Sequence, residues 1–259
     1  MEQAQWLVLS LGKGTRDYAW SPDSKTIAFK QKTVEESKRI SNTLHTFNVK
    51  TKQSTLLKTD VPGHGFLRWA DRGIEVKSVV PVKNRETGSF EIVNKVFDVS
   101  DEEFRQSNDP IVYYDQIDNK HFVIVEDGNG NVLSKTGGYI LPIMSPKNDK
   151  FLATRSARTY VLNLSGEILT NLGYADNEMW SEDGELIIYQ IGEAGGWHGQ
   201  TLIGSEIFVI NIDGTDKNQL THTPDIIEMK PHWSGNASKI TYFDESTGKI
   251  FVSVLEYEE

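Results

Sequence analysis

The sequence has 259 residues, of which 37% are hydrophobic and 25% are charged. This composition is typical of a globular protein, and it excludes an intrinsically disordered chain and a collagen-like one. A net charge of −10 disfavours general nucleic-acid binding, and the absence of cysteine excludes disulfide bonds, thiolate metal sites and a cysteine nucleophile. The longest apolar runs, at 6–9 and 207–210, have the length of strands and are too short for a membrane span.

The chain begins with a short apolar segment, residues 4–9, which predicts a β-strand. No positively charged region precedes it, and it is too short for the apolar core of a signal peptide. The sequence as given therefore predicts a cytoplasmic protein, or a periplasmic or extracellular one if an export signal has been removed.

A short motif then recurs along the chain. It places Trp before Ser or Ala and an Asp or Asn, and a β-branched or aromatic segment follows. The clear copies begin at Trp20, Trp180 and Trp233, and the weaker ones at Trp69 and Met144. A degenerate copy near 113–115, ahead of the apolar segment 121–125, fills the widest interval. Six such units average about 43 residues, which is the size of one propeller blade.

Each unit contains the residues that an antiparallel meander needs. Asp-Ser at 23–24, Asp-Gly at 183–184 and Asn-Ala at 236–237 tolerate the positive φ of a tight hairpin. Further strand pairs are predicted at 45–49 with 54–57, at 159–163 with the turn 165–167, and at 206–211 with 218–221. No amphipathic helix of ten residues is present, and 34–40 is predicted to be a charged loop. The Trp side chains are predicted to pack between neighbouring sheets.

These patterns predict an all-β fold in which residues 1–259 form a single domain, a six-bladed β-propeller of four-stranded antiparallel blades. The chain after Trp233 provides only three strands, so the N-terminal strand is predicted to complete the C-terminal blade. Such sharing covers two exposed strand edges and closes the ring.

The sequence resembles the TolB-like β-propellers, which are built from WD40-like repeats. The segment 206–243 follows that repeat in order, through 207–214, 219–221, Pro224 and 231–234. The units at Trp20 and Trp180 match moderately, those at Trp69 and Met144 weakly, and 75–138 hardly at all. The resemblance implies six blades and a scaffold that binds other proteins; the extra N-terminal domain of a full TolB has no counterpart here.

Motifs that carry chemistry are absent. The sequence has no Gly-x-Ser-x-Gly elbow, His-Glu-x-x-His pair, P-loop or Gly-x-Gly-x-x-Gly turn, so we predict no catalytic residue, metal or cofactor. Asp127 to Asn131 begins like a calcium loop, but Val132 and Gly138 replace the turn glycine and the bidentate glutamate. We predict a tight turn there.

Candidate binding residues follow from propeller geometry. The residues two to five positions before each repeat anchor begin the innermost strand, at one mouth of the channel, and convergent polar groups around a concavity favour a binding site. Long connections at 30–42, 83–91 and 192–205 should open on the same face. The last connection contains a Trp-His pair that could recognise a partner or cover apolar surface, and His64 is expected to be a structural histidine rather than a metal ligand. The predicted binding residues are Asp17, His64, Asp176, Glu178, Trp197, His198, Glu228 and Lys230.

Two hypotheses for function remain open. The first is a non-catalytic, monomeric interaction module that holds a protein or peptide partner at the channel mouth and the long loops, without nucleic acid. The alternative is a metal-dependent enzyme, with His64, His198, Asp176 and Glu228 as ligands. It follows from a resemblance to oligogalacturonate lyases, whose repeats are similar and whose channel holds a histidine-rich metal site.

Overall fold

The computed structural model describes residues 7–9, 15–34, 40–61, 66–70, 73–83, 90–98, 103–106, 108–195, 201–247 and 249–255. These residues form strands and turns and no helix, which confirms the all-β prediction. Consequently no described segment is a helix that could cross a membrane. The chain divides into two compact units, an N-terminal unit of Leu11–Ile111 and a C-terminal unit of Met1–Ser10 with Val112–Glu259.

The N-terminal unit contains two antiparallel four-stranded sheets, each with its strands in chain order. The first comprises β2 (Thr15–Trp20), β3 (Thr26–Val34), β4 (Ile40–Asn48) and β5 (Gln53–Lys58). The second comprises β6 (Phe66–Ala70), β7 (Gly73–Lys83), β8 (Phe90–Asp98) and β9 (Glu103–Gln106). A core that includes Ala28, Leu44 and Val76 joins the two sheets.

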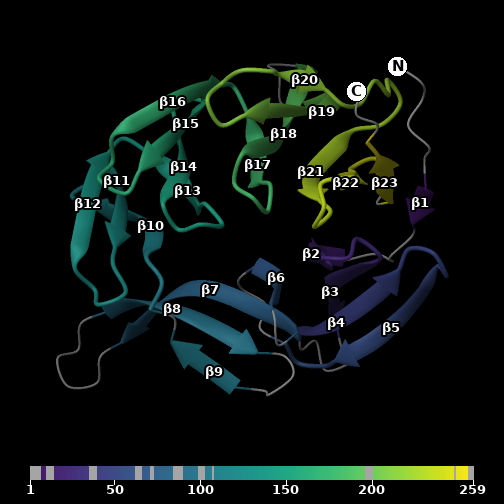
Figure 1. Cartoon of the computed structure of the whole chain (residues 1–259), viewed down its shortest axis with the longest axis horizontal. Helices are drawn as coiled ribbons and strands as arrows, with labels where there is room; N and C mark the ends of the chain where they lie inside the picture. The colour runs from purple at the N-terminus through teal and green to yellow at the C-terminus, as the bar shows by residue number, and fades with distance from the viewer. Residues whose placement is uncertain are drawn as a thin grey trace. The chain divides into compact units, whose positions relative to one another are not determined.

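The C-terminal unit contains four more sheets, whose strands can be followed by label in Figure 1. The first sheet comprises β10 (Ile111–Ile117), β11 (Lys120–Glu126) and β12 (Val132–Gly137). The second comprises β13 (Ile140–Met144), β14 (Lys150–Arg155), β15 (Arg158–Asn163) and β16 (Ile168–Gly173). The third comprises β17 (Asp176–Trp180), β18 (Leu186–Gly195), β19 (Thr201–Asn211) and β20 (Asn218–Gln219).

The last sheet combines the two ends of the chain. Its strands β21 (Glu228–Trp233), β22 (Lys239–Asp244) and β23 (Ile250–Val254) are followed by β1 (Leu7–Leu9) at the edge. β1 is antiparallel to β23, with Leu7 opposite Val252 and Leu9 opposite Ile250. The predicted N-terminal strand therefore supplies the fourth strand of the last sheet.

The hairpin after each clear repeat anchor has the predicted backbone. Its positive-φ residues are Ser24 (56°), Gly184 (70°) and Ala237 (53°). A buried serine stabilises each turn, because its Oγ accepts a hydrogen bond from the backbone N–H five residues later. These bonds are 3.0 Å at Ser21, 2.9 Å at Ser181 and 2.9 Å at Ser234. The Ser-x-Asp or Ser-x-Asn part of the repeat is thus a turn motif.

Tryptophans of the repeat pack between sheets, as predicted. Trp180 is 6% exposed and its indole N–H donates to the carbonyl of Ile143, in the sheet before its own, at 3.2 Å. In the N-terminal unit, Trp69 donates to the carbonyl of Ala19 at 3.1 Å in the same way. Each indole therefore adds a directed hydrogen bond to the apolar packing of two sheets.

Four first strands carry a bulge that the sequence did not predict. The residue three positions before the anchor has positive φ in β2, β13, β17 and β21, and the register shifts beside it. These residues are Asp17 (40°), Leu141 (51°), Asn177 (51°) and Lys230 (53°). A bulge bends its strand and changes the direction of its side chains.

The predicted loop 192–205 is wrong, since most of it is strand. β18 and β19 remain paired through Gly192 with Ser205, Glu193 with Gly204 and Gly195 with Thr201. Glycine stands in this ladder because a Cβ at Gly192 would lie 2.6 Å from Leu202 Cδ1, and one at Gly195 2.6 Å from Ile203 Cγ2. In the predicted connection 30–42, β3 continues to Val34 and β4 begins at Ile40, whereas the predicted connection 83–91 agrees with the end of β7 at Lys83 and the start of β8 at Phe90. Within the predicted charged loop 34–40, Val34 and Ile40 are strand residues, and 35–39 lie outside the described residues.

The tight turn predicted at 127–131 is confirmed. One carboxylate oxygen of Asp127 accepts the backbone N–H groups of Asn129 (2.8 Å) and Asn131 (2.9 Å), and the other accepts the Asn131 amide (2.9 Å). The carboxylate thereby closes the connection between β11 and β12.

Candidate functional site

The starts of β17 and β21 lie close to the β18–β19 hairpin in the C-terminal unit. β21 contacts β17, β18 and β19. The backbone N–H of Lys230 donates to Gln190 Oε1 at 2.8 Å, and Ser205 forms a parallel bridge with Ile227. The last two sheets therefore meet at the edge where their first strands begin.

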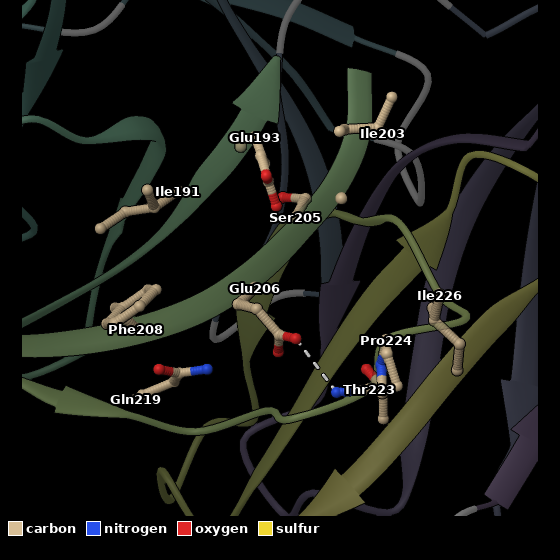
Figure 2. A pocket seen from close by; sticks show the side chains of 12 residues that line it. Ile191, Glu193, Ile203, Ser205, Glu206, Phe208, Gln219, Thr223, Pro224 and Ile226 are labelled. Atoms are coloured by element: carbon tan, nitrogen blue, oxygen red, sulfur yellow. Dashed lines mark hydrogen bonds between the residues drawn. The ribbon is translucent and has the colours of Figure 1, made fainter. Parts of the chain in front are cut away.

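A pocket of about 400 Å³ opens at this edge, between the hairpin and the segment that leads into β21. Figure 2 shows its side chains. The apolar lining consists of Ile191, Ile203, Phe208, Pro224 and Ile226. The polar lining consists of Glu193, Ser205, Glu206, Gln219 and Thr223, together with the backbone of Gly192 and Gly204.

Strand alternation in β19 places the key side chains on the pocket. Ile207 is fully buried, so Glu206 and Phe208 lie on the opposite face of the strand, towards the pocket. The backbone N–H of Ile207 donates to Thr221 Oγ1 at 2.8 Å, which holds the segment after β20 against β19. That segment then turns at Pro224 and places Thr223 beside the Glu206 carboxylate (Figure 2).

Thr223 connects two acidic side chains. Its backbone N–H donates to Glu206 Oε1 at 3.1 Å, and its hydroxyl donates to Glu228 Oε1. The second oxygen of each carboxyl group is buried and has no hydrogen-bond partner in the described part of the chain. A buried polar atom without a partner is costly, and such atoms are uncommon in folded proteins. The carboxyl groups of Glu206 and Glu228 therefore each keep one oxygen that a further hydrogen-bond partner could satisfy.

The electrostatics of this pair are unusual. Burial, reinforced by the charges of Glu206 and Asp244, raises the pKa of Glu228 to about 8. Burial also acts to raise the pKa of Asp244, but hydrogen bonds from the hydroxyls of Thr247 and Ser246 outweigh it and hold that pKa below its usual value. At neutral pH Glu228 is therefore mainly protonated, whereas Asp244 is ionised.

Of the predicted binding residues, Glu228 reaches this cluster and Lys230 lies beside it. Asp176 is exposed and accepts a hydrogen bond from the Tyr174 hydroxyl at 2.6 Å. Glu178 accepts one from the Thr159 hydroxyl, and burial raises its pKa. The hydrogen bonds of the described side chains connect neither Asp176 nor Glu178 to Glu228.

Asp17 belongs to the N-terminal unit, where it forms an ion pair of 2.8 Å with the buried Lys30. His64, Trp197 and His198 lie outside the described residues. The structure therefore leaves the roles of these three residues as predictions.

Sequence reasoning missed Ser205, Glu206 and Thr223, and also Glu193 at the rim. Glu206 lies within β19, directly before the apolar segment 207–210, and its alternation with the buried Ile207 was the available signal. Thr223 gave no signal, because its role depends on the turn at Pro224.

No family model and no curated protein matches the sequence. Solved structures do match it along nearly its whole length, at low identity. The β-propeller domain of Cps50 (Swd1) from Myceliophteria thermophila has a TM-score of 0.60 and 9% identity, over 97% of this chain and all of that one. Oligogalacturonate lyase from Vibrio parahaemolyticus has a TM-score of 0.54 and 10% identity, over 98% of this chain and 97% of that one. A chain of the mitotic checkpoint complex has a TM-score of 0.54 and 9% identity, over 98% and 91%.

The class of protein is thus defined at the level of the fold: the chain has a β-propeller fold. TolB from Acinetobacter baumannii also matches, with 16% identity over 95% of this chain and 55% of that one. Its TM-score is only 0.42, so the fold assignment depends on the stronger matches.

Proposed function

We propose that this chain is a non-catalytic propeller that binds a polypeptide partner. The observation that carries the proposal is the pocket at the edge of the last two sheets. It combines apolar walls with buried polar atoms that have no partner among the described residues, and this combination is typical of a binding site. One propeller of similar fold belongs to a multi-protein complex, the mitotic checkpoint complex, which favours a protein partner.

The proposal includes the arrangement of the whole chain as one domain, 1–259. In it, the sheets are six blades of a ring, and β1 completes the last blade and closes the ring. The pairing of β1 with β23 supports this arrangement, since it joins the two ends of the chain in one sheet. The protein is proposed to be a monomer that binds neither nucleic acid nor a cofactor.

In this proposal the binding surface consists of the pocket and the residues around it. Glu228 accepts a hydrogen bond from the pocket residue Thr223, and Lys230 follows it in β21. Asp176 and Glu178 lie in β17, the neighbouring first strand. Trp197 and His198 stand in the sequence between β18 and β19, and we propose that they contact the partner. Asp17 and His64 are proposed to extend this surface at the corresponding positions of the first two repeats.

A selection from a phage-displayed peptide library tests this function. A binding module enriches peptides that share a sequence motif, and a synthetic copy of the motif binds the wild-type protein saturably. We expect Trp197→Ala to weaken that binding at least tenfold, without lowering the melting temperature. A selection that yields no shared motif contradicts the proposed function. Equal binding of the peptide by wild type and Trp197→Ala contradicts the proposed role of Trp197.

A second candidate function is a metal-dependent lyase, which the similarity to oligogalacturonate lyase favours. Its ligands would be His64, His198, Asp176 and Glu228. The described residues do not fit a metal well: no group of three or more His, Asp or Glu among them could hold a metal ion, and Glu228 is mainly protonated at neutral pH. Elemental analysis, with melting curves before and after chelation, tests this candidate. A stoichiometric metal whose removal lowers the melting temperature would favour the lyase over the interaction module.

A further inference from the structure

The geometry points to a specific occupant of the pocket. We infer that it receives one long basic side chain, arginine or lysine, of the polypeptide partner, with Glu206 as the counter-ion. This inference rests on the proposed function, and it adds the chemistry of the residue that is recognised.

The charged side chains that line the pocket are acidic, while the Lys217 ammonium group lies outside the lining, 5.0 Å from the centroid of the Phe208 ring. Two carboxyl groups line the pocket, those of Glu193 and Glu206, and its described lining contains no Lys, Arg or His. Because the whole chain carries a net charge of −10, the surrounding field also favours a cation and repels an anion.

The buried polar atoms of the pocket need hydrogen-bond donors. Glu206 uses one carboxylate oxygen for the N–H of Thr223, and its other oxygen is buried without a partner within the described chain. Ser205 also has a buried hydroxyl without a partner there, but it shares the face of Ile207 in β19, opposite Glu206. A guanidinium or ammonium group supplies several donors and no acceptor, so it can pair with the Glu206 carboxylate.

The apolar walls fit the remainder of such a side chain. Ile203, Phe208 and Ile226 line the pocket around the Glu206 carboxylate (Figure 2). Arginine and lysine side chains commonly lay their methylene groups along apolar surface while the charged end reaches a polar partner. A volume of about 400 Å³ lies near the lower end of the range for ligand pockets, which suits a single side chain.

An NMR titration with a minimal probe tests the inference. The probe is acetyl-Gly-Arg-Gly-amide, and the control probe replaces arginine with citrulline, which has nearly the same shape and no charge. We expect saturable shifts of the backbone amides of Ser205, Glu206 and Thr223, with a Kd on the order of millimolar, as befits a single side chain. Arginine should bind more tightly than lysine, because its planar group can donate two N–H groups to the Glu206 carboxylate. The citrulline probe should not bind.

Glu206→Gln is the decisive variant, since it keeps the acceptor for Thr223 and removes the charge. This variant should bind the arginine probe at least tenfold more weakly than wild type does. The matched control is Glu182→Gln, which changes an exposed carboxylate in the turn that follows β17. The inference would be overturned if wild type and Glu206→Gln bound the arginine probe equally, or if the citrulline probe bound as tightly as the arginine probe. It would also be overturned by chemical-shift changes confined to other sheets, or by no binding of the arginine probe at tens of millimolar. If library-selected peptides bind while the arginine probe fails, only this inference is wrong; if no motif is selected, the proposed function fails.

Discussion

At the scale of single residues, the site depends on Thr223. One residue donates its backbone N–H to Glu206 and its hydroxyl to Glu228, and so holds two acidic side chains at adjacent positions. Two like charges in a buried place cannot both be ionised without cost. The protein avoids this cost at neutral pH by keeping Glu228 protonated.

The raised pKa of Glu228 predicts how stability depends on pH. The folded protein holds a proton on Glu228 up to about pH 8, whereas the unfolded chain loses it near the ordinary glutamate pKa. Between these two values the folded state binds more protons, so this residue makes stability fall as pH rises towards 8 and above. The groups that face Glu228 are Glu206, Asp244 and Tyr242; the charges of Glu206 and Asp244 oppose its ionisation, whereas the neutral Tyr242 hydroxyl does not.

Glu228→Gln should therefore stabilise the protein at alkaline pH. At pH 9 we expect its free energy of unfolding to exceed that of wild type by roughly 1–3 kcal/mol, the cost of an unpaired buried polar group, and the difference to shrink near pH 5. Urea unfolding at several pH values measures it, with Glu182→Gln as the control for a lost charge. A constant difference between pH 5 and pH 9 would contradict the assignment.

At the scale of elements, the hairpin β18–β19 shows why the glycines of 192–205 led to the wrong prediction of a loop. Gly192 and Gly195 suggested a loop, but they stand in a continuous ladder, where their missing side chains leave room for Leu202 and Ile203. Close packing between neighbouring side chains depends on register, and register is not visible in a glycine pattern. The strands and turns of the repeats were predictable, because their apolar segments and Ser-x-Asp turns have local causes.

The bulges and the pocket could not be predicted for a similar reason. The positive-φ positions are occupied by Asp17, Leu141, Asn177 and Lys230, which share no chemistry, so their conformation follows from their place in the sheet. Glu228 was predicted from its distance to an anchor, whereas Thr223 and Ser205 acquire their roles only when two sheets meet.

Gly195→Ala should destabilise this hairpin. The new Cβ would lie 2.6 Å from Ile203 Cγ2, and the β-branched Ile203, which also lines the pocket, has few rotamers available. We expect a loss of roughly 1–2 kcal/mol in the free energy of unfolding. Gly204→Ala is the matched control, because its Cβ would meet its nearest atom at an ordinary 3.6 Å. Equal stability of the two variants would show that the close approach at Gly195 is not important.

At the scale of the whole molecule, the N-terminal strand is the feature that the proposed ring depends on. β1 covers the edge of β23, and its removal would expose the backbone groups of that strand. Deletion of residues 1–12 should lower the melting temperature by on the order of 5 °C or more, measured by calorimetry. A truncated protein that melts at the wild-type temperature would contradict closure by this strand.

The central claim is that a polypeptide partner binds at the edge of the last two sheets. Hydrogen–deuterium exchange, with and without a library-selected peptide, tests it most directly. The account predicts slower exchange in the paired residues of β18 and β19, Gly192 to Gly195 and Thr201 to Phe208, and in the segment from Gln219 to Glu228. Protection confined to other sheets, such as β13–β16, with unchanged exchange in the hairpin, would contradict it.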